Sequence, residues 1–136
     1  MCAQKLSILI PAYNEAATIH LILNKVLAVR LTGGILKEVI IVNDCSRDDT
    51  EKVISEYIRQ HPEAEIRLFN QPVNMGKGAA IHKGIELATG EYTVIQDADL
   101  EYDPEEYNIL LKPVLDGFAD VVQTWKPAIN YSVRRS

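Results

Sequence analysis

The sequence predicts an α/β domain whose mainly parallel sheet is flanked by helices on both faces. Short, solid apolar runs of strand length alternate along the chain with segments that repeat apolar residues at helical spacing. Strands that are apolar on both faces are typical of a parallel sheet buried between helices. The chain has 136 residues, 47% of them hydrophobic, which suits one domain with a sizeable core. We expect the domain to occupy residues 1–125 and residues 126–136 to form an irregular C-terminal tail.

The first strand and helix follow from these patterns. Residues 5–10 form a nearly continuous apolar run, and Pro11 stops it. Helical spacing begins further on, and Gly33-Gly34 is expected to end that helical region. The apolar positions of this helix are Ile19, Ile22, Leu23, Val26 and Leu27.

A second strand and helix come next. Residues 39–42 are apolar and run into Asn43-Asp44. Residues 46–49, Ser-Arg-Asp-Asp, match a capping box, which predicts the start of a helix. Pro62 lies just beyond the expected end of that helix, and residues 65–69 are a third, shorter strand. The apolar face of the helix carries Val53, Ile54, Tyr57 and Ile58.

The rest of the chain repeats the alternation. Residues 79–88 are expected to be helical, with Gly90 as the residue after the helix cap. Residues 92–95 are a fourth strand, and Pro104 suits the first turn of a further helix. Residues 120–124 are expected to be a fifth strand.

Charge, cysteine use and hydropathy limit the classes of function. The net charge of −5 gives no sign of a nucleic-acid surface. Cys2 and Cys45 lack metal-ligand spacing and fit a reducing compartment. No stretch is long enough to span a bilayer, and Pro11 and Asn14 interrupt the N-terminal apolar run, which excludes a signal peptide. We therefore expect a cytoplasmic protein, with the cytoplasmic face of a membrane as a second possible location.

Polar residues cluster where three predicted strands end, at residues 11–15, 43–46 and 97–99. In a parallel α/β sheet, ligands bind outside the carboxyl ends of the strands. Asp97 and Asp99 are spaced two residues apart, so both carboxylates face the same way in extended backbone. Two carboxylates so close together repel each other, and a divalent cation removes that cost. Their hard oxygen atoms are ligands that suit Mg²⁺ or Mn²⁺. The alternative is a solvated turn in which Asp99 caps a helix.

The other clusters also allow two interpretations. Asp44 can accept hydrogen bonds from a base or a ribose, or it can cap the following helix; Ser46 is the better cap by spacing, which would leave Asp44 free for a ligand. Tyr13-Asn14-Glu15 opens a helix, with Asn14 as cap, and Tyr13 is placed to stack on a nucleobase. Residues 74–78, Asn-Met-Gly-Lys-Gly, suit either an anion site at a helix start or a flexible turn, and do not form a Walker A loop.

Taken in order, these clusters resemble the motifs of family 2 inverting glycosyltransferases of the GT-A fold. The extension from Gln96 to Pro104 is most similar to the polyprenyl-phosphate branch of that family. The resemblance covers residues 5–122. Its motifs are Pro11-Ala12-Tyr13-Asn14-Glu15, Asn43-Asp44-x-Ser46-x-Asp48, Asn74-x-Gly76-Lys77-Gly78 and Asp97-Ala98-Asp99.

The resemblance implies a GT-A, Rossmann-like fold that binds a GDP- or UDP-sugar and transfers the sugar, with inversion, to a polyprenyl phosphate. It implies that Asp44 contacts the base, that Asp97 lies on the ribose or metal side, and that Asp99 binds the Mg²⁺ or Mn²⁺ that bridges the diphosphate. Asp97 is thus a second metal candidate. The nucleotide-sugar-binding residues that it implies are Pro11, Ala12, Tyr13, Glu15, Asp44, Gly76, Lys77, Asp97 and Ala98.

The chain also departs from the family. The resemblance implies longer catalytic domains in this branch, so this domain is expected to be truncated after the fifth strand. The acceptor side and any general base are then expected to be missing, and no catalytic residue is assigned. An alternative function is a truncated, non-catalytic nucleotide-sugar-binding or oligomerising module, because exposed apolar surface favours self-association. A sugar-nucleotide pyrophosphorylase is disfavoured, since residues 11–15 are not a Gly-rich loop.

Overall fold

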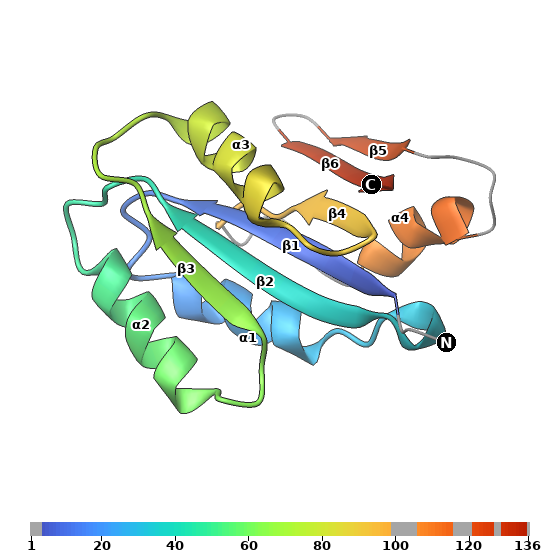
Figure 1. Cartoon of the computed structure of the whole chain (residues 1–136), viewed down its shortest axis with the longest axis horizontal. Coiled ribbons are helices and arrows are strands. Elements are labelled where there is room, and N and C mark those ends of the chain that lie inside the picture. Colours follow the sequence, from blue (N-terminus) through green and yellow to red (C-terminus); the bar gives the residue numbers. More distant parts are fainter. Residues whose placement is uncertain (1–3, 99–105, 116–120, 127–128, 136) are drawn as a thin grey trace.

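A computed structural model describes residues 4–98, 106–115, 121–126 and 129–135. One six-stranded sheet forms its centre, and helices lie on both faces (Figure 1). A short 3₁₀ turn, η1, separates the first helix from the second strand. The elements are β1 (Lys5–Ala12), α1 (Ile19–Ala28), η1 (Thr32–Gly34), β2 (Leu36–Asn43), α2 (Thr50–Gln60), β3 (Ile66–Asn70), α3 (Lys77–Leu87), β4 (Tyr92–Ile95), α4 (Glu106–Leu115), β5 (Val121–Lys126) and β6 (Ile129–Arg135).

The sheet is mainly parallel, as the sequence predicts. Its strand order is β3-β2-β1-β4-β6-β5. The first four strands in this order pair in parallel, whereas β6 pairs antiparallel with both β4 and β5. The prediction of an irregular tail at residues 126–136 is therefore wrong for Ile129–Arg135. These residues show little periodicity in the sequence, yet backbone pairing on both sides makes them a strand.

Two cores of unequal size hold the helices to the sheet. Alternate residues of β1 point to opposite faces: Ile8 and Ile10 pack with α1, α2 and α4, whereas Leu9 packs under α3. Figure 1 shows α3 alone on its side of the parallel strands. The larger core contains the helix residues Ile19, Ile22, Leu23, Val26, Ile54, Tyr57, Tyr107 and Leu111.

Helix α1 ends earlier than the glycines suggest. The Lys37 ammonium donates to the carbonyl oxygens of Val26, Leu27 and Val29 at 3.1, 2.7 and 2.6 Å, which satisfies the end of the helix at Ala28. Gly33-Gly34 belongs instead to η1, where both residues have a φ of 70°. The prediction that these glycines end the helix is therefore wrong.

Gly90 is also present for a different reason. Helix α3 is capped at Ala88, so Gly90 is not the residue after the cap, contrary to prediction. A Cβ atom at Gly90 would lie 2.6 Å from the carbonyl oxygen of Lys5 and 2.7 Å from Ser7 Oγ. The close approach of the α3–β4 connection to β1 requires a glycine here.

A buried carboxylate ties that connection to the sheet. Glu38 on β2 is 1% exposed and accepts hydrogen bonds from Ser7 Oγ at 2.6 Å, from the Thr89 N–H at 3.0 Å and from the Thr89 hydroxyl at 2.9 Å. Arg67 forms an ion pair with it at 2.9 Å. Burial alone would raise the pKa of Glu38, but these donors and the Arg67 charge outweigh burial and hold the pKa below its ordinary value of 4.5.

None of the described helices is both long and apolar enough to cross a membrane.

Replacing Glu38 with Gln is expected to lower the free energy of unfolding by about 2–3 kcal/mol at neutral pH, because the amide NH₂ then faces groups that need an acceptor. The folded-state pKa of Glu38 is depressed, so its carboxylate contributes fully above pH 4.5. That contribution is lost as the pH falls through the folded-state pKa, and the gap between the two proteins should narrow in acid. Urea unfolding at a series of pH values measures it.

Glu86→Gln is the matched control. Glu86 pairs with Lys83 at 3.3 Å on an exposed surface of α3, where loss of the pair has little effect on stability. A Glu38→Gln protein as stable as wild type at neutral pH would contradict the prediction, and so would a gap that widens in acid.

Candidate functional site

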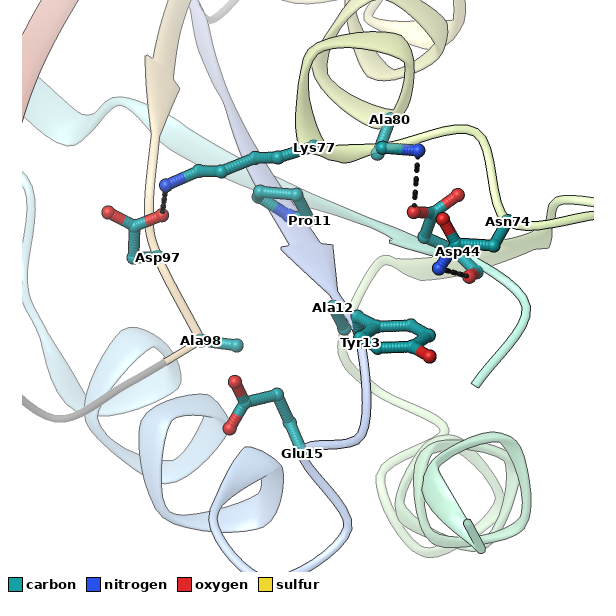
Figure 2. A pocket seen from close by; sticks show the side chains of 11 residues that line it. Pro11, Ala12, Tyr13, Glu15, Asp44, Asn74, Lys77, Ala80, Asp97 and Ala98 are labelled. Carbon is teal, nitrogen blue, oxygen red and sulfur yellow. Dashed lines mark hydrogen bonds and ion pairs between the residues drawn. The ribbon is translucent and has the colours of Figure 1, made fainter. Parts of the chain in front are cut away.

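A pocket of about 440 Å³ opens at the carboxyl ends of β1, β2 and β4. All nine residues that the resemblance implies for nucleotide-sugar binding line it, which brings together four segments far apart in the sequence (Figure 2). The tenth predicted site residue, Asp99, lies outside the described residues. The full lining is Pro11, Ala12, Tyr13, Glu15, Asp44, Asn74, Gly76, Lys77, Ala80, Asp97 and Ala98.

The loop after β1 turns at Asn14 before the helix begins. Asn14 has a φ of 54°, in the left-handed region that few residues other than glycine adopt. Helix α1 starts only at Ile19, so the prediction that Tyr13-Asn14-Glu15 opens the helix with Asn14 as cap is wrong. The N–H of Asn14 instead donates to Ser46 Oγ at 2.9 Å, and its Oδ1 accepts from the N–H of Arg47 at 2.8 Å.

The loop after β2 does not form the predicted capping box. Helix α2 begins at Thr50 after Asp49, which makes no capping hydrogen bond through its side chain. Asp48 accepts from the N–H of Thr50 at 3.0 Å and from the Thr50 hydroxyl, and its other oxygen accepts from the N–H of Ala16 at 3.3 Å. Burial alone would raise the pKa of Asp48, but these hydrogen bonds outweigh it and lower the pKa.

Asp44 fastens the third loop of the pocket. Its side chain is 4% exposed, and its two oxygens accept the N–H groups of Met75 and Gly76, both at 2.8 Å. Gly76 has a φ of 94°, a conformation that requires glycine, and α3 begins at the next residue. Asp44 therefore already has two partners, whereas the sequence analysis expected it to have none. Each of its oxygens keeps a further lone pair that a ligand can use.

An ion pair crosses the pocket between Lys77 and Asp97. Lys77 stands at the first position of α3, and Figure 2 shows its side chain reaching past Pro11 to the carboxylate of Asp97. The first turn of a helix and an ammonium group together attract anions. The pocket thus places the positively charged Lys77 ammonium beside the Asp97 carboxylate.

Two buried residues that the sequence analysis did not select hold the backbone at Asp97. The Gln96 N–H donates to the carbonyl oxygen of Leu9 at 2.8 Å, and its side-chain Nε2 donates to the carbonyl oxygen of Asp97 at 3.2 Å. The hydroxyl of Tyr107 on α4 donates to Gln96 Oε1 at 2.5 Å. The sequence did offer a sign of the role of Gln96, because this polar residue directly follows the apolar residues Val94 and Ile95.

Of the two carboxylates of the predicted metal site, only Asp97 belongs to the described residues. Asp97 lines the pocket and supplies the hard oxygen ligands that Mg²⁺ or Mn²⁺ prefers. Across the described residues, no three or more His, Cys, Asp or Glu side chains gather in a way that could hold a metal ion. The donor set at Asp97 suits a hard cation, but a complete site requires further ligands beside it, for which Asp99 remains the prediction.

The comparisons with known proteins agree with one another. Residues 7–136 match the sequence model of the family described as Glycosyl transferase family 2. A dolichyl-phosphate beta-glucosyltransferase of Trichomonas vaginalis is 37% identical over 114 residues, which is 80% of this chain and 35% of that protein. A dolichyl-phosphate beta-glucosyltransferase of Dictyostelium discoideum is 34% identical over 110 residues, covering 76% of this chain and 33% of that protein. The chain spans about a third of the length of these relatives.

Solved structures share the fold. A mannosyltransferase of Pyrobaculum calidifontis, in complex with GDP-Man and Mn²⁺, superposes with a TM-score of 0.81 at 20% identity, over 99% of this chain and 45% of that one. A glucosyl-3-phosphoglycerate synthase of Mycobacterium tuberculosis, solved with Mn²⁺, UDP and glucosyl-3-phosphoglycerate, gives a TM-score of 0.70 at 27% identity, over 90% and 44%.

Replacing Asp44 with Asn should release the loop that precedes α3. An amide accepts through one oxygen only, and its NH₂ would face an N–H donor. We expect hydrogen exchange at Met75 and Gly76 to become about ten to a hundred times faster, the effect of losing one or two hydrogen bonds to a charged acceptor. Mass spectrometry or NMR measures the exchange.

Asp49→Asn is the control, because Asp49 makes no capping hydrogen bond through its side chain. Unchanged exchange at Met75 and Gly76 in the Asp44→Asn protein would show that the carboxylate does not hold this loop.

Proposed function

The chain belongs to glycosyl transferase family 2 and has the GT-A fold, and on that premise we propose that its pocket binds a nucleotide-diphospho-sugar. The observation that carries this proposal is the convergence of Tyr13, Asp44, Lys77 and Asp97 on one pocket. The pocket volume of about 440 Å³ lies within the range of small-molecule sites. Because the chain belongs to a glycosyl transferase family, we do not pursue the alternative of a sugar-nucleotide pyrophosphorylase.

The pocket has two chemically different ends. At one end, Tyr13, a residue that is 40% exposed, offers an aromatic ring, and Asp44 has lone pairs left to accept from a base or ribose. At the other end, the Lys77 ammonium, which reaches Asp97 from the start of α3, offers positive charge to a diphosphate. We therefore place the nucleoside against Tyr13 and Asp44, and the diphosphate between Lys77 and Asp97.

We propose that Asp99, with Asp97, holds Mg²⁺ or Mn²⁺ at the diphosphate. A divalent cation there would stabilise the negative charge that develops on the leaving phosphate. The Lys77 ammonium balances the charge of Asp97. Binding of the nucleotide frees Lys77 to contact a phosphate, because its long side chain stands at the edge of the pocket.

We propose transfer with inversion to a polyprenyl phosphate, at the cytoplasmic face of a membrane, as the reaction of the whole protein. The dolichyl-phosphate beta-glucosyltransferases among the relatives support this acceptor class. A phosphate acceptor is already an anion, so its attack on the sugar from the face opposite the diphosphate needs little help from a general base.

Calorimetric titration of GDP and of UDP, with and without Mn²⁺, tests the site. We expect one of the two nucleotides to bind and Mn²⁺ to strengthen the binding. In the Asp99→Ala protein the Mn²⁺ effect should fall by about tenfold or more, because a ligand of the cation is lost. The Asp49→Ala protein is the control. If neither nucleotide binds, the proposed function fails; if Asp99→Ala leaves the Mn²⁺ effect intact, the metal assignment fails.

Lys77→Met separates the role of the ammonium from the shape of the side chain. Methionine keeps most of the length but removes the charge, so nucleotide affinity should fall by about tenfold, the size of one charge-assisted hydrogen bond. Lys83→Met is the matched control, because Lys83 lies on the same helix over the ring of Phe69, away from the pocket lining. Equal nucleotide affinity in the Lys77→Met and Lys83→Met proteins would contradict the phosphate assignment.

A further inference from the structure

The loop that carries Tyr13 and Glu15 is held by side chains of a different loop. Three consecutive backbone N–H groups, those of residues 14–16, donate to side chains of the β2–α2 connection and of the first residue of α2. Their acceptors are the hydroxyls of Ser46 and Thr50, both at 2.9 Å, and the carboxylate of Asp48, at 3.3 Å. The two loops are therefore joined by hydrogen bonds that involve residues about 30 positions apart in sequence.

The accepting hydroxyls are oriented from behind. Thr50 is fully buried, and its hydroxyl donates to Asp48 Oδ1, so its lone pairs face the N–H of Glu15. The Ser46 hydroxyl donates to Oδ1 of the buried Asn43 at 2.5 Å, so its lone pairs face the N–H of Asn14. Each hydroxyl thus donates in one direction and accepts in the other, as a hydroxyl does when both its roles are used.

These hydrogen bonds hold Asn14 in the left-handed region, which asparagine tolerates better than most residues other than glycine. A left-handed conformation costs a residue other than glycine about 1 kcal/mol, and surrounding contacts must supply it. Asn14 lies between Tyr13 and Glu15, so its backbone conformation sets where both pocket-lining side chains point. Ser46 and Asp48 are not among the residues that line the pocket.

We propose that Ser46 and Asp48 are positioning residues that set the affinity of the pocket for the nucleoside part of its ligand without touching it. The inference rests on the proposed function, because it takes Tyr13 and Glu15 to face a bound nucleotide. The diphosphate end stands on α3 and the end of β4, and the hydrogen bonds of Ser46 and Asp48 do not reach it. Loss of either residue should therefore weaken nucleoside recognition and leave pyrophosphate binding unchanged.

The test compares two probes on one set of variants. In Ser46→Ala and Asp48→Asn proteins, the affinity for the nucleotide that wild type binds, GDP or UDP, should fall by about tenfold, the effect of one lost hydrogen-bonded support. Affinity for inorganic pyrophosphate with Mn²⁺ should stay within about twofold of wild type. Ser46→Thr keeps the hydroxyl and should restore nucleotide affinity, and Asp49→Asn is the control for a nearby acidic residue.

Hydrogen exchange at residues 14–16 reports separately whether the loop has been released. Faster exchange with unchanged nucleotide affinity would overturn the positioning role, and so would an equal loss of nucleotide and pyrophosphate affinity. Ser46→Ala removes one hydroxyl only, so it tests the inference even where Asp48→Asn does not fold. If the wild-type protein binds pyrophosphate but neither nucleotide, the proposed function fails. Because this result comes from the wild-type protein alone, it is distinguishable from a failure of the positioning role, which only the variants reveal.

Discussion

Parallel pairing of β1 with β2 and with β4 is the constraint from which the pocket follows. In the observed register Ala12 lies opposite Asn43, and Leu9 lies opposite Ile95. Asp44 therefore leaves the sheet beside the end of β1, and Asp97 follows β4 at the level of Pro11. A slip in register would separate these side chains, because successive residues of a strand point to opposite faces. Polar groups from distant parts of the sequence meet because the strands run in one direction.

The sequence was a good guide to whatever depends on periodicity and order. Solid apolar runs predicted the four parallel strands, and the rule that ligands bind beyond the carboxyl ends of such strands brought Tyr13, Asp44 and Asp97 to one edge. These predictions succeed because burial on both faces of a sheet leaves a pattern that a single sequence retains. The Asp99 side of the site is still a prediction.

The sequence was a poor guide where one side chain had several possible partners. Ser46 has the right spacing to cap α2, but its hydroxyl is used by Asn14 and Asn43, and tertiary hydrogen bonds outweigh the local cap. Gly90 resembles a helix terminator, yet close contact with β1 explains it. Residues 129–135 lack a strand pattern because pairing with β4 and β5 decides their conformation. Each error concerns a contact between segments far apart in the chain.

Asp44 connects the two ends of the pocket because it serves both at once. Its oxygens accept hydrogen bonds from the N–H groups of Met75 and Gly76. These bonds fix the start of α3 and so the backbone position of Lys77. A carboxylate oxygen accepts along two lone-pair directions, so a base or ribose can bind Asp44 without displacing either N–H group. In the proposed complex, nucleoside binding and phosphate placement share the buried charge of Asp44, whose position the hydrogen bonds to Met75 and Gly76 already fix. Such preorganisation spares the ligand the cost of ordering this loop.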